Sequence, residues 1–322
     1  MLLQAATIAI GFAVLTWSAD CFVAGASATA RRLGVSTLII GMTVVGFGTS
    51  APEMLVSAIA AWQGNAGIAL GNAVGSNITN VGLILGVTSL LYPLQVRSRI
   101  LHRELPVLLL VMAVTLALCL DGTLSRLNGV ALLAGLVLLL AWLTRVGARS
   151  GDGPDVMGLE FEAHLHEDLT LGAALWRLIL GLVLLLASSR ALVWAAVGIA
   201  ESLGVSDLVI GLTVVALGTS LPELAASVAS ARKGEHDIAL GNVIGSNMFN
   251  LFGVLGIAST ITPFGVSHES LVRDFPVMVA ITVGLFVMAY GFRGRGRINR
   301  IEGLLLLAAY LGYQGYLLVT QL

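Results

Sequence analysis

The sequence predicts an all-α polytopic membrane protein, with ten transmembrane helices arranged as two inverted five-helix repeats. Three observations carry this prediction. Of the 322 residues, 57% are hydrophobic and only 11% are charged, with a mean hydropathy of +0.96. An ordinary soluble domain has about 25% charged residues, so this chain has too little charge to cover a water-facing surface. The apolar residues also fall in long continuous runs, and one stretch of the chain occurs twice.

A helix that crosses a ~30 Å hydrocarbon core needs about 20 mostly apolar residues. The first such segment is predicted to be a permanent span, because the first basic residue is Arg31 and the positive region of a signal peptide is missing. Division of the chain at charge clusters and turn residues gives spans 1 to 10, at residues 5–28, 35–61, 67–92, 104–120, 127–146, 171–198, 205–231, 237–262, 275–292 and 301–320.

The repeat is long and free of gaps. Residues 34–93 align with residues 204–263 at a constant offset of 170, and half of the 60 positions are identical. The first copy reads GMTVVGFGTSAPE at 41–53 and IALGNAVGSNITN at 68–80; the second reads GLTVVALGTSLPE at 211–223 and IALGNVIGSNMFN at 238–250. We therefore predict a first repeat at 1–146, an acidic linker at 147–170 and a second repeat at 171–322.

Five spans in each repeat is an odd number, so the second repeat enters the membrane from the opposite side. Basic residues support this topology, because cytoplasmic loops are enriched in them. Only Arg126 and Arg273 follow even-numbered spans, and Arg190 lies inside span 6. Fourteen follow or border odd-numbered spans: Arg31, Arg32, Arg97, Arg99, Arg103, Arg145, Arg149, Arg177, Arg232, Lys233, Arg293, Arg295, Arg297 and Arg300. Both termini are predicted to lie outside an inner or plasma membrane, with the linker in the cytoplasm.

Four short segments in spans 2, 3, 7 and 8 combine helix breakers or glycine with small polar residues, at residues 48–53, 75–77, 218–223 and 245–247. Proline removes a backbone donor and frees a carbonyl group. Discontinuous helices in matching positions of two halves point to a transporter's binding site. We therefore expect broken helices in these four spans.

The chemistry of these segments suits a hard cation. Glu53 and Glu223 lie near the centres of spans 2 and 7, where a carboxylate without compensation is costly. Hydroxyl, amide and carbonyl oxygens surround them in the sequence, and Ca²⁺ or Na⁺ prefers such ligands. No His or Cys lies among them, which argues against zinc or copper. The structural alternative is close packing, in which the serines and glycines fit helices together and Asn77 and Asn247 only cap or bridge them.

GTSAPE with GNAVGSNITN, and GTSLPE with GNVIGSNMFN, resemble the two alpha-repeats of the sodium/calcium exchanger family. The resemblance implies an antiporter that exports Ca²⁺ in exchange for Na⁺, with these ions as its substrates and no other cofactor. It implies Ca²⁺ binding by Glu53, Glu223 and the carbonyls of Thr49 and Thr219. For Na⁺ it implies both glutamates with Ser50, Ser220, Ser76, Ser246 and the carbonyls of Gly46 and Ala216. Asn80, Asn250, Asn77 and Asn247 are expected to line the site.

Some relatives, including potassium-dependent ones, place an aspartate at the last position of the second GSN motif. Here Asn80 and Asn250 are both neutral, which disfavours co-transport of K⁺. Exchange of H⁺ for a divalent cation stays open, and a cation channel is a further alternative. An enzyme is not expected, because neither GxSxG nor HExxH occurs and the linker is too short for a catalytic domain. A net charge of −1 leaves no basic field for nucleic acid. The expected partners are the two ions and the lipid bilayer, without an obligate protein partner. Asp20 and Arg190 occupy equivalent repeat positions at different depths, so we do not expect them to pair.

Overall fold

The computed structural model describes residues 2–64, 67–96, 101–149, 169–202, 219–290 and 296–321. Almost all of these residues are helical. The α-helices are α1 (Leu2–Leu33), α2 (Thr37–Ile40), α3 (Gly46–Trp62), α4 (Gly67–Thr79), α5 (Gly86–Leu91), α6 (Leu101–Cys119), α7 (Arg126–Arg149), α9 (Leu171–Ser202), α12 (Leu221–Arg232), α13 (His236–Met248), α14 (Leu255–Ile261), α15 (Phe275–Tyr290) and α16 (Arg300–Gln321). The π-helical turns are η1 (Gly41–Val45), η2 (Asn80–Leu85), η4 (Phe249–Val254) and η5 (Ser270–Asp274).

Seven stretches of the described chain are long and apolar enough to cross a membrane. They correspond to predicted spans 1, 2, 3, 5, 6, 8 and 9. Spans 4 and 10 are present as the helices α6 and α16, and α12 forms the described part of span 7. The prediction of a helical protein with several membrane spans is therefore confirmed.

The helices run through three of the four segments where the sequence predicts breaks. Pro52 lies inside the α-helix α3, and residues 75–77 and 245–247 lie inside α4 and α13. For these segments the predicted break is wrong. The proline is accommodated with the loss of one backbone hydrogen bond, and the distortion occurs in neighbouring π-helical turns such as η1. In span 7, Ser220 precedes α12, and residues 203–218 lie outside the described part.

The two halves of the chain pack into each other. Helix α16 of the second half packs on α5 and η2 of the first half, and α7 of the first half packs on α14 and η4 of the second. Two short antiparallel ladders also join the two halves: β1 (Leu94–Gln95) pairs with β4 (Arg297–Ile298), and β2 (Thr123–Leu124) pairs with β3 (Phe264–Gly265). Neither half therefore forms its core from its own helices alone.

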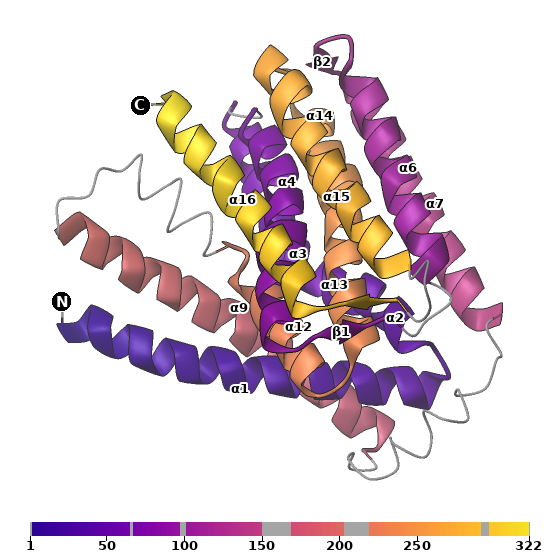
Figure 1. Ribbon diagram of the computed structural model, residues 1–322, viewed down its shortest axis with the longest axis vertical. Helices are drawn as coiled ribbons and strands as arrows, with labels where there is room; N and C mark the ends of the chain where they lie inside the picture. The colour runs from indigo at the N-terminus through magenta and orange to yellow at the C-terminus, as the bar shows by residue number, and fades with distance from the viewer. Residues whose placement is uncertain are drawn as a thin grey trace.

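Helices α1 and α9 form a separate pair that lies side by side and crosses the other helices (Figure 1). Their backbones approach closely, because a Cβ at Gly25 would lie 2.4 Å from the Leu178 nitrogen and one at Gly181 would lie 2.4 Å from the Phe22 nitrogen. Glycine permits such close packing between membrane helices. The two helices therefore pack together as one unit.

Glycine also sets the distance between α13 and the start of span 2. A Cβ added to Gly245 would lie 2.2 Å from the Met42 carbonyl oxygen, and one added to Gly241 would lie 2.7 Å from the Leu38 carbonyl oxygen. No side chain fits there without displacing the backbone of the facing helix. This contact brings the polar residues of α13 against the first turns of α3.

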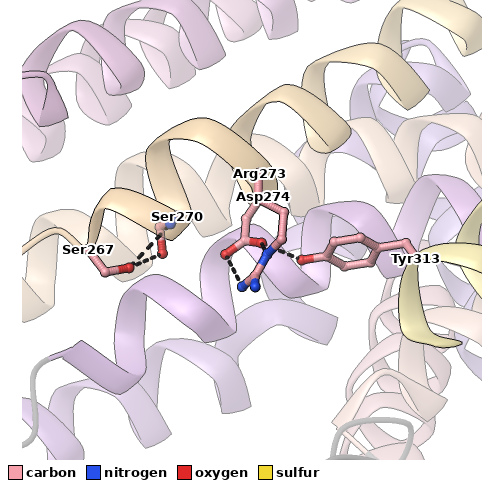
Figure 2. A network of polar contacts seen from close by, with 5 residues as sticks. All are labelled: Ser267, Ser270, Arg273, Asp274 and Tyr313. Carbon is pink, nitrogen blue, oxygen red and sulfur yellow. Dashed lines mark hydrogen bonds and ion pairs between the residues drawn. The ribbon is translucent and has the colours of Figure 1, made fainter. Parts of the chain in front are cut away.

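At the start of α15, η5 carries a small polar network (Figure 2). The Arg273 guanidinium bonds to the Asp274 carboxylate, with a distance of 2.6 Å from Nε to Oδ1. The Tyr313 hydroxyl of α16 donates to the same carboxylate oxygen at 2.9 Å, and the Ser267 and Ser270 hydroxyls lie 2.9 Å apart. The network ties the beginning of α15 to α16, away from the repeated motifs.

Candidate cation site

The repeated motifs meet where α3, α4, α12 and α13 pack together. Glu53 of α3 and Glu223 of α12 lie there, and each residue is only 2% exposed. The side chains of Thr49, Ser50 and Glu53 lie near the Glu223 carboxylate. The structure thus brings together two acidic groups that are 170 residues apart in the chain.

Two asparagines that the sequence analysis missed hold the glutamate segments in place. The Asn72 Nδ2 amide of α4 donates to the Ser57 hydroxyl at 3.0 Å and to the Glu53 backbone carbonyl at 3.5 Å. The Asn242 Nδ2 amide of α13 makes the equivalent bonds, at 3.0 Å to Ser227 and 3.2 Å to the Glu223 carbonyl. Both asparagines end the IALGN segment, which is identical in the two copies of the repeat, and this identity could have pointed to them.

Thr49 links the first copy of the motif to the second. Its hydroxyl lies 3.1 Å from Oδ1 of Asn242 and 3.4 Å from the hydroxyl of Ser246. The Gly46 carbonyl accepts contacts from Thr49 at 3.3 Å and from Ser246 at 3.4 Å. These distances lie at the long end of hydrogen bonding. The oxygens therefore lie close together but form only weak hydrogen bonds with one another.

The four expected lining asparagines bond across the two copies. The Asn80 amide donates to the Asn247 carbonyl oxygen at 3.0 Å, and the Asn250 amide donates to the Asn77 carbonyl oxygen at 3.3 Å. Residues 80 and 250 are equivalent in the repeat, as are residues 77 and 247. The bridging role that the sequence left open for Asn77 and Asn247 is therefore observed.

Several buried polar atoms in this region have no hydrogen-bond partner among the described residues. They are Oε2 of Glu53, Oε2 of Glu223, Oγ of Ser50, Oδ1 of Asn250 and Nδ2 of Asn247. A buried polar group without a partner costs about 1–3 kcal/mol, and native proteins contain few of them. Four of these five atoms are oxygens, which is the chemistry that a hard cation requires.

The other expected ligands lie at or beside this cluster. The Ser76 hydroxyl of α4 donates to Oδ1 of Asn72 at 3.5 Å, and Ser220 is buried directly before α12. Thr219 is partly buried beside it. Ala216 lies outside the described residues, so its predicted role stays a prediction.

Comparison with known proteins gives a consistent assignment. The profile of the family described as sodium/calcium exchanger protein matches residues 3–145 and 173–319 of the chain. The match covers most of both halves of the chain and leaves out mainly residues 146–172.

Relatives are similar along the whole chain. The CaxA protein of Alkalimonas amylolytica is 48% identical over 321 residues, which cover 99% of this chain and 100% of CaxA. The inner membrane protein YrbG of Escherichia coli is 42% identical over 284 residues, covering 88% of this chain and 87% of YrbG. A structure of the sodium-calcium exchanger NCX_Mj, soaked with 2.5 mM Na⁺ and 0.1 mM Ca²⁺, has a TM-score of 0.82 and 33% identity, with 97% of each chain covered.

Proposed function

The chain belongs to the sodium/calcium exchanger family, and on this premise we propose that it is an antiporter that exports Ca²⁺ in exchange for Na⁺. Family membership supports cation/Ca²⁺ antiport as the general activity. The observation that carries the proposal is the group of buried oxygens without protein partners around Glu53 and Glu223. Two carboxylates balance the charge of one Ca²⁺, and several Na⁺ ions can occupy the same oxygens in its place.

The proposed Ca²⁺ ligands are the Glu53 and Glu223 carboxylates with the backbone carbonyls of Thr49 and Thr219. Na⁺ is proposed to bind at the same glutamates together with the serine and carbonyl oxygens of the repeats: Ser50, Ser220, Ser76, Ser246, Gly46 and Ala216. Asn72 and Asn242 are proposed as positioning residues, because each bonds to a glutamate carbonyl without contributing charge.

The proposed mechanism is alternating access. Spans 2, 3, 7 and 8 form a core that holds the ions, and the pair α1 and α9 moves across it to expose the site to one side at a time. The glycine contacts between α1 and α9 support their movement as one body. Neither helix carries a proposed ligand. Inverted topology of the halves 1–146 and 171–322, around the cytoplasmic linker, allows the two open states to mirror each other.

We further propose that the protein lies in the inner or plasma membrane with both termini outside. The distribution of basic residues supports this orientation. The name of YrbG places that relative in an inner membrane.

Calcium uptake into proteoliposomes tests the proposed exchange. Vesicles loaded with Na⁺ are compared with vesicles loaded with K⁺ or choline, and the assay is repeated with an imposed proton gradient. We expect uptake only with internal Na⁺. Uptake driven by the proton gradient alone would establish H⁺/Ca²⁺ exchange instead, and uptake that needs no counter-ion gradient would indicate a channel.

A further inference from the structure

One stripe of α1 contacts the turn between α12 and α13 through polar and charged side chains. Ser27 and Arg31 follow Asp20 by 7 and 11 residues, about two and three helical turns, so the three residues lie along one face. The Arg232 guanidinium bonds to the Asp20 carboxylate, and the Ser27 hydroxyl donates to the Glu235 carboxylate. Arg31 Nη1 lies 3.7 Å from Oε1 of Glu235.

The two ion pairs have opposite polarity. On α1 the acid Asp20 meets the base Arg232, and three turns later the base Arg31 meets the acid Glu235. This arrangement fixes α1 in one register, because sliding it along the turn would bring like charges together. The Glu235 side chain is only 10% exposed, so its contacts with Arg31 and Ser27 are shielded from solvent more than an ordinary surface pair.

The stripe lies over the part of α12 that follows the proposed cation ligand. Ser227 and Ser230 come four and seven residues after Glu223, on the same helix face, and both are fully buried. Phe22 of α1 belongs to the same buried cluster as Ala226 of α12. Ala229 of α12 belongs to that cluster too, so α1 packs on the Ala226–Ala229 side of α12, next to the face with Ser227 and Ser230 that packs on α13.

The equivalent positions of the other repeat do not reproduce these pairs. Asp20 and Arg31 correspond to Arg190 and Glu201, in which the charges are reversed. The turn with Arg232 and Glu235 corresponds to residues 62–66, whose sequence WQGNA is uncharged. The sequence thus provides oppositely charged partners for α1 at the turn with Arg232 and Glu235. It provides no charged partners for α9 at the equivalent turn, residues 62–66.

We propose that the Asp20–Arg232 and Arg31–Glu235 pairs form a latch that holds α1 against the α12–α13 turn and closes the route from Glu223 to that side. The inference rests on the proposed exchange function, whose topology places this turn in the cytoplasm. Opening the route requires α1 to leave the turn, which breaks both pairs. Because the other turn is uncharged, the latch favours the conformation that is closed on the cytoplasmic side.

Thiol labelling tests the latch without requiring transport. Ser230→Cys is introduced into a chain with Cys21→Ser and Cys119→Ser, and a membrane-impermeant thiol reagent is added at the cytoplasmic face of inside-out vesicles. Neutralising one partner with Asp20→Asn or Arg232→Gln is expected to speed labelling about two- to fivefold, the range expected for loss of one partly exposed ion pair. The charge-swapped double variant, Asp20→Arg with Arg232→Asp, is expected to restore slow labelling.

Arg190→Gln is the matched control, because it removes a charge at the equivalent position of α9 and should leave the labelling rate unchanged. Ala229→Cys serves as a second reporter if Ser230→Cys does not fold. Equal rates in the parent and in both neutralised variants, or fast labelling in the charge-swapped variant, would overturn the latch. Failure of Na⁺-driven Ca²⁺ uptake with normal labelling behaviour would instead refute the exchange function.

Discussion

At the scale of single residues, Asn242 shows how one side chain can organise the proposed cation site. Its amide group donates to Ser227 and to the Glu223 carbonyl, and its oxygen lies near the Thr49 hydroxyl. Asn72 makes the matching contacts with Ser57 and the Glu53 carbonyl. Each asparagine therefore fixes the backbone that presents a glutamate.

Asn242→Ala is expected to weaken Ca²⁺ binding about tenfold, because loss of hydrogen bonds worth about 1.5 kcal/mol loosens the Glu223 segment. Asn72→Ala is expected to have a similar effect through Glu53. The concentration dependence of Ca²⁺ uptake measures both. Asn128→Ala is the control, since its side-chain amide donates to the Leu118 carbonyl and so joins α7 to α6 instead of holding a glutamate segment. Unchanged Ca²⁺ affinity in both repeat variants would exclude the positioning role.

Glu53→Gln and Glu223→Gln are each expected to abolish transport. Each substitution removes one of two negative charges from a buried site, and a divalent cation there then lacks full charge compensation. Initial rates of Na⁺-driven uptake measure the effect. Glu269→Gln, at an exposed position, is expected to retain the parent rate. Parent-level flux in either buried variant would remove the central role of these carboxylates.

The residue types of the site could be predicted from the sequence because the repeat presents them twice. The bonds of Asn72 and Asn242 could not, since an asparagine within a helix gives no sign of which carbonyl it will reach. The cross-repeat pairs of Asn80 with Asn247 and Asn77 with Asn250 were also hidden. They depend on how two helices from different halves meet.

At the scale of elements, helix continuity differs most from the sequence expectation. Pro52 predicts a break, yet α3 continues from Gly46 to Trp62 and a π-helical turn precedes it at Gly41–Val45. Similar turns follow α4 and α13. Proline reveals where a backbone bond is lost, but neighbouring turns decide whether the helix stops or widens.

Glycine contacts between elements are expected to contribute to the stability of the fold. Gly245→Ala would place a methyl group 2.2 Å from the Met42 carbonyl oxygen, so α13 must shift away from span 2. We expect a loss of about 1–3 kcal/mol, seen as a lower midpoint of thermal aggregation in detergent. Gly284→Ala of α15 is the control, because among the described residues no atom outside its own helix lies within 4 Å of its added Cβ. Equal midpoints for the two variants would contradict the proposed close contact.

At the scale of the whole molecule, helices of each half pack on helices of the other half. Span 10 packs on span 3, span 5 packs on span 8, and both short ladders join one half to the other. The sequence predicted seven of the spans well, because hydrophobic length is a local signal. It could not predict how the two halves pack on each other, which depends on contacts between distant segments.

The proposed orientation predicts the location of fused reporters. Alkaline phosphatase, which is active only outside the cytoplasm, is expected to be active after Gln321 and inactive after a fusion within the linker at 150–168. Green fluorescent protein is expected to give the reverse pattern. Fluorescence from the fusion after Gln321 would show that the positive-inside assignment is inverted.

The central claim is that Na⁺ and Ca²⁺ share one site built around Glu53 and Glu223, and direct binding tests it. Calorimetric titration of Ca²⁺ into the purified protein, repeated at rising Na⁺ concentration with ionic strength held constant by choline, is the most direct measurement. We predict one Ca²⁺ per chain, an apparent Kd that rises steeply with Na⁺, and no binding in the Glu53→Gln and Glu223→Gln double variant. Ca²⁺ binding that is insensitive to Na⁺, or that persists in the double variant, would contradict the shared site.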